Sequence, residues 1–166
     1  MTFKKAIVIG PSGAGKSTFS RKLAAATGLP LHHLDMIWHK PDRTTVTREE
    51  FDAALESILS GEKWIIDGHF NRTLERRLLA CDTVFFLDLS LDKCLAGVES
   101  RIGKERPDMP WQEQEFDPEF KQWIIDFHKN KLPELYELLE KYRKSKTIIS
   151  FKSHEEADAY IEKLQK

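Results

Sequence analysis

A phosphate-binding signature near the N-terminus constrains the fold of this chain more than any other feature. Residues 10–17 read Gly-Pro-Ser-Gly-Ala-Gly-Lys-Ser and match the pattern G-x-x-x-x-G-K-[ST]. The apolar, β-branched run of residues 5–10 precedes this pattern, and helical spacing over residues 16–26 follows it. A glycine-rich turn between a strand and a helix lets backbone N–H groups and the helix dipole hold phosphate. The sequence therefore predicts a P-loop of the Walker A type.

We expect this loop to bind ATP or GTP together with Mg²⁺. In this kind of loop, Lys16 reaches the β and γ phosphates, the Ser17 hydroxyl ligates Mg²⁺, and Thr18 lies near the α phosphate. The sequence contains no Asn-Lys-x-Asp guanine signature, which removes the usual support for guanine specificity but leaves the base preference open. The predicted nucleotide contacts are Gly10, Pro11, Ser12, Gly13, Ala14, Gly15, Lys16, Ser17 and Thr18.

Short apolar runs and helical patterns alternate along the rest of the chain. The runs predict strands at residues 31–34, 64–66, 82–89 and 146–151. The helical patterns cover residues 47–60, 74–79, 91–102, 120–142 and 155–164. Thr47 and Glu50 form a capping signature, and Pro133 predicts a kink or junction. Such alternation is typical of a parallel sheet with right-handed crossovers.

We therefore expect an α/β fold of the P-loop NTPase type, a doubly wound five-stranded parallel sheet with helices on both faces. Charge, proline and isolated aromatic residues replace the helical pattern over residues 103–118. This stretch predicts a short lid outside the core. The whole chain, residues 1–166, is predicted to be a single P-loop kinase domain, with its core at residues 1–102 and 119–166.

The charge balance limits the partners. Lys and Arg total 26 against 27 Asp and Glu, a formal charge of −1. This balance argues against attraction to nucleic-acid backbone or anionic lipid. The apolar runs are too short to span a membrane, and no export signal is visible at the N-terminus. We expect a cytoplasmic protein without a membrane partner or direct nucleic-acid binding, and the sequence leaves its oligomeric state open.

Two aspartates that follow apolar strands are candidates for holding the metal ion. A carboxylate at the carboxyl end of a strand lies beside the phosphate loop in such a sheet. We rank Asp67 first, as a Walker B residue that holds Mg²⁺ opposite Ser17. Asp67-Gly68 is also a common turn dipeptide. Asp88 ranks second, because it also suits a cap for the following helix.

Several stretches resemble nucleoside monophosphate kinases. GPSGAGKST, WIIDGHFNRT and SRIGKER are similar to the P-loop, the D-G-F-P-R-T region and the lid entry of adenylate kinase and its relatives. HLDMIWHKP, REEF, WIIDGHFNRT and DTVFFLDLS resemble more closely the adenylate-kinase-related family named topology modulation protein, or FlaR-like. The resemblance covers most of the chain. It implies a P-loop kinase core with an ATP or GTP donor site.

The resemblance also implies roles for three arginines. Arg72 matches the arginine that meets the acceptor's phosphate in monophosphate kinases, with one residue more between Gly68 and Arg72 than the family has. Arg101 and Arg106 match the arginines that open the lid, where one lies against the nucleotide base and another helps to neutralise the transferred phosphate. Their spacing differs from the family's R-x-x-G-R, so Lys104 is a further candidate. A guanidinium suits these roles because it is always charged and binds phosphate in a bidentate way.

Asp35 follows the second predicted strand, where monophosphate and small-metabolite kinases place acceptor contacts. It would orient or deprotonate an acceptor hydroxyl, whereas a phosphate acceptor needs no base and Asp35 would only position it. We therefore predict an ATP-dependent phosphotransferase that moves the γ-phosphoryl group to a small acceptor, first a nucleoside monophosphate. The alternatives are a hydroxylated metabolite as acceptor, or a nucleotide-binding regulator that affects DNA topology.

Overall fold

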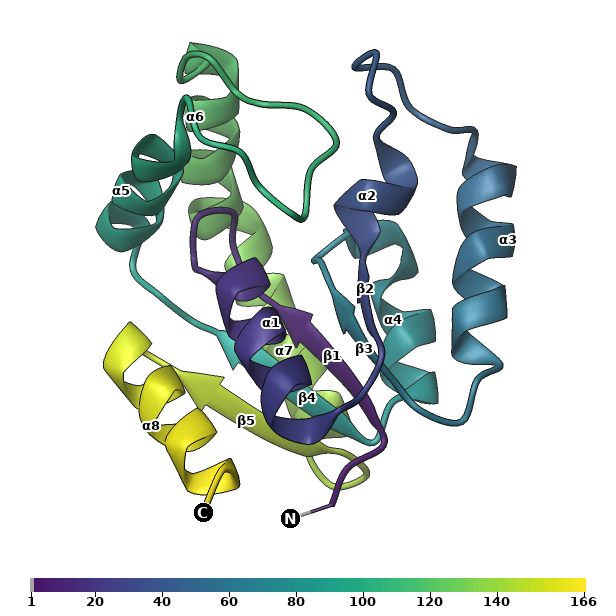
Figure 1. The fold of residues 1–166 in the computed structure, drawn as a ribbon. Helices are drawn as coiled ribbons and strands as arrows, with labels where there is room; N and C mark the ends of the chain where they lie inside the picture. The colour runs from purple at the N-terminus through teal and green to yellow at the C-terminus, as the bar shows by residue number, and fades with distance from the viewer. Residues whose placement is uncertain (1) are drawn as a thin grey trace.

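A central parallel sheet organises the molecule (Figure 1). The computed structural model describes residues 2–166. The sheet has five strands in the order β2-β3-β1-β4-β5, and all neighbouring pairs are parallel. The strands are β1 Lys5–Ile9, β2 Leu31–His33, β3 Trp64–Asp67, β4 Thr83–Leu87 and β5 Thr147–Phe151. The predicted five-stranded parallel sheet is confirmed, with the first strand of the chain at its centre.

Helices cover both faces of the sheet, as predicted. One face carries α3, α4 and α7, and the other carries α1, α5 and α8. Within residues 2–166, no helix combines the length and the apolar character that crossing a membrane would require. The helices are α1 Lys16–Thr27, α2 Leu34–Trp38, α3 Arg48–Leu59, α4 Asn71–Ala80, α5 Leu91–Arg101, α6 Pro118–Asp126, α7 Leu132–Tyr142 and α8 His154–Leu164.

The alternation of side chains along β1 divides the core between these two faces. Ile7 and Ile9 point into the layer with α3, α4 and α7, whereas Ala6 and Val8 point into the layer with α1, α5 and α8. All four side chains are fully buried. Burial of each large aliphatic side chain stabilises the fold by about 1.5–3 kcal/mol. The continuous apolar run that predicted β1 is therefore the result of burial on both sides.

Two local features differ from the sequence prediction. The short helix α2 follows β2 directly and was not expected. In addition, the predicted long helix of residues 120–142 is divided into α6 and α7 by a π-helical turn, Phe127–Lys131. Pro133 lies in the first turn of α7, where its missing N–H group is tolerated. The predicted junction at Pro133 is therefore confirmed, because the π-helical turn ends at Lys131 and α7 begins at Leu132.

Candidate active site

The P-loop lies between β1 and α1 and forms one wall of an open cleft of about 1530 Å³. Gly15 caps α1 with a φ of 90°, and no side chain caps the N-terminus of this helix. Its first N–H groups therefore remain available for an anion. Lys16 Nζ donates a hydrogen bond to the carbonyl oxygen of Pro11, at 2.8 Å. Of the predicted loop residues, six line the cleft, namely Ser12, Gly13, Gly15, Lys16, Ser17 and Thr18. The other three, Gly10, Pro11 and Ala14, are buried and do not line it.

The back of the loop is packed closely against neighbouring elements. A methyl group added at Gly13, whose φ is 82°, would lie 2.0 Å from the carbonyl oxygen of Cys94 on α5. On the other side, Nε2 of His154, the first residue of α8, lies 3.1 Å from the carbonyl oxygen of Ala14. The loop is thus held in shape by α5 and α8 before any nucleotide binds.

Gly97→Ala should displace the P-loop, because the added methyl group would lie 2.2 Å from the carbonyl oxygen of Gly13. We expect a loss of stability of about 1–3 kcal/mol and at least about tenfold weaker ATP binding, since backbone atoms must move. Urea unfolding and titration calorimetry measure the two effects. Ala96→Ser, on the exposed side of α5, should change neither. Unchanged ATP affinity in a folded Gly97→Ala variant would contradict this account.

Asp67 ends β3 beside the P-loop, with its backbone in register with Val8 of β1. The side chain is buried, and its Oδ2 lies 2.6 Å from Nδ1 of His33. The second oxygen, Oδ1, is buried without a hydrogen-bond partner. Mg²⁺ is commonly held by one or two carboxylates while substrate phosphates and water supply its other ligands. This carboxylate therefore fits the predicted metal site.

Ser17, which is predicted to ligate Mg²⁺ opposite Asp67, is hydrogen-bonded to Arg21. Ser17 Oγ accepts a hydrogen bond from Nη1 of Arg21 at 2.6 Å, and Thr18 Oγ1 lies 3.5 Å from Nη2 of the same guanidinium. Ser17 would have to release Arg21 before it could ligate Mg²⁺. Asp88, the competing metal candidate, lines a separate, smaller cavity and accepts a hydrogen bond from the Tyr136 hydroxyl at 2.6 Å. The geometry favours Asp67 over Asp88 as the carboxylate near the phosphates.

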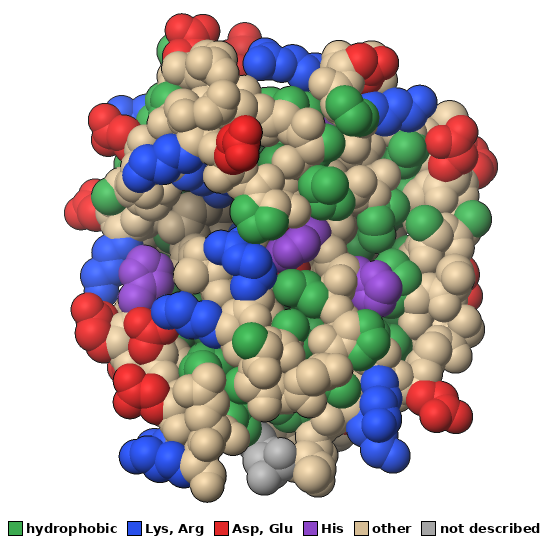
Figure 2. All heavy atoms as spheres, viewed as in Figure 1, with side chains coloured by type: hydrophobic (Ala, Val, Ile, Leu, Met, Phe, Trp, Pro, Cys, Tyr) green, Lys and Arg blue, Asp and Glu red, His purple; other side chains and the backbone are tan. Residues whose placement is uncertain are grey.

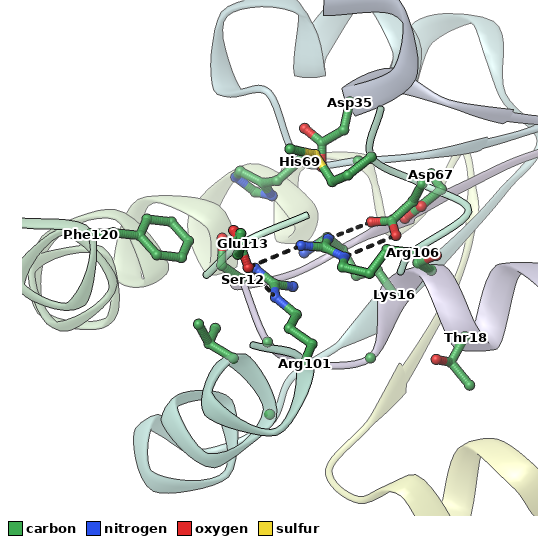
Figure 3. Close-up of a pocket in the computed structure, with 18 of the residues that line it drawn as sticks. Ser12, Lys16, Thr18, Asp35, Asp67, His69, Arg101, Arg106, Glu113 and Phe120 are labelled. Carbon is green, nitrogen blue, oxygen red and sulfur yellow. Dashed lines mark hydrogen bonds and ion pairs between the residues drawn. The ribbon is translucent and has the colours of Figure 1, made fainter. Parts of the chain in front are cut away.

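Asp35 lies at the start of α2 and lines the cleft opposite the lid arginines (Figure 3). Burial and the negative charge of Asp67 raise the pKa of Asp35, while Lys16 opposes this shift. Burial lowers the pKa of Lys16, and the two aspartates counteract that effect. Lys16, Asp35 and Asp67 therefore form one electrostatic group. A carboxylate with a raised pKa near a phosphate cradle is suited to accept a proton.

The segment predicted as a lid at residues 103–118 connects α5 to α6 and borders the cleft; Arg106 of this segment and Arg101 at the end of α5 both belong to the lining. Arg106 Nη2 lies 2.6 Å from Asp108 Oδ2, and its Nη1 lies 3.4 Å from Oε2 of Glu113. Arg101 Nε approaches the same Glu113 oxygen, at 3.4 Å. Figure 3 shows the two arginines converging on this glutamate. Incoming phosphates would have to compete with these carboxylates for the guanidinium groups. Lys104 is exposed and lies outside the lining.

Arg72 does not join this group. It lies on the solvent side of α4 and makes two hydrogen bonds to Asp52 of α3, at 2.7 and 3.2 Å. The inward face of α4 instead carries Thr73, Leu74 and Arg77. Helical periodicity thus turns Arg72 away from the cleft. The structure therefore separates Arg72 from the other predicted catalytic residues.

Sequence reasoning missed Arg77, which is completely buried. Its guanidinium donates to the carbonyl oxygens of Gly68, His69 and Phe70, and to Thr73 Oγ1. These bonds fix the turn that carries His69 into the cleft lining. The burial of Arg77 lowers its pKa to about 9. A signal was present in the sequence, because Arg77 shares one helix face with Leu74 and Leu78 at the spacing of a buried face.

A contact between the lid and the segment after α2 was also missed. The guanidinium of Arg43 lies over Trp111 of the lid, with its Cζ atom 5.0 Å from the centre of the Trp111 ring. The same ring packs edge-on against His39. Arg43 Nη2 also donates to the carbonyl oxygen of Gln112 at 3.3 Å. We call residues 39–45 the arm, which is closed by an antiparallel bridge between His39 and Thr45. No sequence motif links the arm to the lid, because the contact joins two irregular segments.

Lysine, arginine and histidine side chains gather across the middle of the face that carries the cleft (Figure 2).

No protein-family model and no curated protein sequence matches this chain. Solved structures do match. A shikimate kinase from Bacteroides thetaiotaomicron is 18% identical with a TM-score of 0.64, and the match covers 99% of this chain and 97% of that one.

The chain has the fold of a P-loop kinase. A gluconokinase from Sinorhizobium meliloti 1021 is 17% identical with a TM-score of 0.57, covering 98% of this chain and 89% of that one. Deoxyadenosine kinase from M. mycoides is 14% identical with a TM-score of 0.55, covering 96% of each chain. At these identities the likeness is one of fold. Membership of the topology modulation family stays a prediction.

Proposed function

We propose that this protein transfers the γ-phosphoryl group of ATP or GTP to a hydroxyl group of a small molecule. The observation that carries the proposal is the placement of Asp35 in the cleft, in electrostatic contact with Lys16 of the P-loop. A hydroxyl acceptor needs a group that takes its proton, whereas a phosphate acceptor needs a cation that holds it. Asp35 supplies the first requirement. Arg72, the cation expected to hold a phosphate acceptor, is paired with Asp52 instead.

In this reaction the acceptor oxygen attacks the γ-phosphorus while Asp35 takes its proton, and the bond to the β-phosphate oxygen breaks to release the nucleoside diphosphate. Lys16 would balance the charge on the transferred group, and the lid arginines Arg101 and Arg106 would join it after leaving Glu113 and Asp108. Mg²⁺, when bound near Asp67, would neutralise charge on the β and γ phosphates. The shikimate kinase, gluconokinase and deoxyadenosine kinase that share the fold support a kinase with a small acceptor.

Asp35→Asn should reduce kcat by about a hundredfold or more, because the amide cannot take the proton. In the wild type, activity should fall on the acid side as pH drops through the pKa of Asp35. That pKa is raised by burial and by Asp67, so the loss should begin at a higher pH than for an ordinary carboxylate. Coupled release of ADP, measured across a panel of nucleotides and hydroxylated metabolites, gives both results.

Arg72→Gln is the matched control for this experiment. It removes an exposed ion pair with Asp52, which contributes about 0–1 kcal/mol to stability, and it should leave turnover nearly unchanged. If the acceptor is a nucleoside monophosphate, the expectation is reversed, and Arg72→Gln should lower turnover more than Asp35→Asn does. That reversal would reject a hydroxyl acceptor.

A further inference from the structure

Buried polar atoms without partners are concentrated in the cleft. Within residues 2–166, five such side-chain atoms occur, and four of them belong to residues that line the cleft. A buried, unpaired donor or acceptor costs about 1–3 kcal/mol and is rare in native proteins. A cluster of them in one cleft therefore points to a ligand that completes their hydrogen bonds. The four atoms are Asp67 Oδ1, His69 Nδ1, Trp111 Nε1 and Arg101 Nε, and the last of these has an ion-pair contact with Glu113 at 3.4 Å but no hydrogen bond.

Three of these four atoms can be assigned to one side of the cleft or the other. Asp67 and Arg101 act electrostatically on Lys16 and belong to the phosphate side of the cleft. Trp111 packs against His39, whose Nε2 lies 3.8 Å from Oδ1 of Asp35. Trp111 is therefore linked to the proposed base through His39, which places it on the acceptor side. The phosphates and the metal account for Asp67 and Arg101, but nothing in the proposed transfer step uses Trp111 Nε1.

The arginines on the acceptor side are already engaged in other contacts. Arg106 is paired with Asp108 and Glu113. Arg43 covers the Trp111 ring and donates to a backbone carbonyl of the lid. Binding an anionic acceptor here would require one of these contacts to break, and it would also bring a negative charge towards Asp35. The proposed transfer step already assigns Arg106 to the transferred phosphoryl group, so repulsion from Asp35 is what disfavours an acceptor with a carboxylate or phosphate group.

Aromatic side chains form a further part of the cleft lining. His69 lines the cleft, and its buried Nδ1 has no hydrogen-bond partner. The ring packs edge-on against Phe127, which also lines the cleft. Trp38 and Phe70 contribute further aromatic surface and contact one another. Flat aromatic walls with a few hydrogen-bonding groups suit a ring-shaped ligand.

We propose that the acceptor is an uncharged ring compound with hydroxyl groups, the class that includes nucleosides and neutral sugars, and that Trp111 Nε1 donates a hydrogen bond to it. The inference rests on the proposed function and specifies the substrate class of that site. Trp111 makes the lid part of the acceptor site, because its ring is held by the arm through Arg43 and His39. The lid would thereby contact the acceptor as well as the nucleotide.

Matched pairs of acceptors test the charge requirement. The pairs are adenosine and guanosine against their 5′-monophosphates, and glucose against gluconate, each assayed by coupled ADP release and by titration calorimetry. We expect the uncharged member to have a kcat/KM at least about tenfold higher, and the nucleoside and sugar arms distinguish the two sources. A preference for the anionic member would overturn the inference. Binding of MgATP without binding of any uncharged compound would also overturn it but would leave the proposed function standing, whereas absence of MgATP binding would reject the proposed function itself.

Trp111→Phe tests the hydrogen bond separately, because phenylalanine keeps an aromatic ring beside Arg43 and lacks the N–H group. We expect the KM for the acceptor to rise about fivefold to tenfold, with kcat and the KM for ATP nearly unchanged. Trp111→Leu, which also removes the aromatic ring, should raise the acceptor KM further. Equal acceptor KM values for the wild type and Trp111→Phe would show that Trp111 does not contact the acceptor.

Discussion

Lys16→Met should lower kcat/KM for phosphoryl transfer by about a thousandfold or more, the loss expected when the cation that balances charge on a transferred phosphoryl group is removed. The lysine is buried among Asp35, Asp67 and Arg101, so solvent cannot replace its charge. Methionine keeps the length of the side chain and removes a cation whose burial is itself costly, so the variant should remain folded. Coupled ADP release measures turnover, and circular dichroism checks the fold.

Lys163→Met is the control for Lys16→Met. Lys163 lies exposed in the last turn of α8, and its replacement should leave turnover within about twofold of the wild type. Full turnover by a folded Lys16→Met variant would reject the role of the P-loop lysine in transfer. Loss of turnover in both variants would point to a general effect of lowered positive charge.

Arg77→Met should cost about 3 kcal/mol or more of the free energy of unfolding. The substitution leaves the carbonyl oxygens of Gly68 and His69 without the Arg77 donors, whereas the carbonyl oxygen of Phe70 keeps a hydrogen bond from the Thr73 N–H group at 3.1 Å. Buried groups left unpaired in this way each cost about 1–3 kcal/mol, out of a total stability of about 5–15 kcal/mol for a typical domain. Urea unfolding measures the change.

Arg76→Met provides the comparison for Arg77→Met. Arg76 is the adjacent residue on α4, but its guanidinium is exposed and pairs with Glu56. Its loss should cost less than about 1 kcal/mol. Equal destabilisation by the two substitutions would show that the buried hydrogen bonds of Arg77 add nothing to the stability of the turn.

The fold was largely predictable because its determinants are local. The apolar run of residues 5–9 and the capping signature at Thr47 each depend on neighbours in the sequence. The structure confirms both, since β1 spans Lys5–Ile9 and the Thr47 hydroxyl accepts from the Glu50 N–H group at 3.1 Å. Helix α2 escaped prediction because its five residues give too short a period to recognise.

The site was predictable only in part. A continuous motif placed Lys16 in the cleft, and the end of a strand placed Asp67 beside it. Arg72 was assigned by resemblance, but the start of α4 at Asn71 rotates it outward. The contact between Trp111 and Arg43 depends on how two irregular segments meet, and no periodicity encodes such a meeting.

The central position of β1 affects the order in which the molecule can assemble. β1 pairs with β3 on one side and with β4 on the other, and His154 reaches the P-loop from a helix near the end of the chain. The nucleotide cradle therefore gains its full support only after His154, 140 residues beyond Ala14 in the sequence, has reached it. Contacts so distant in sequence slow folding, and a nucleotide that binds only the completed cradle cannot stabilise the chain before these contacts form.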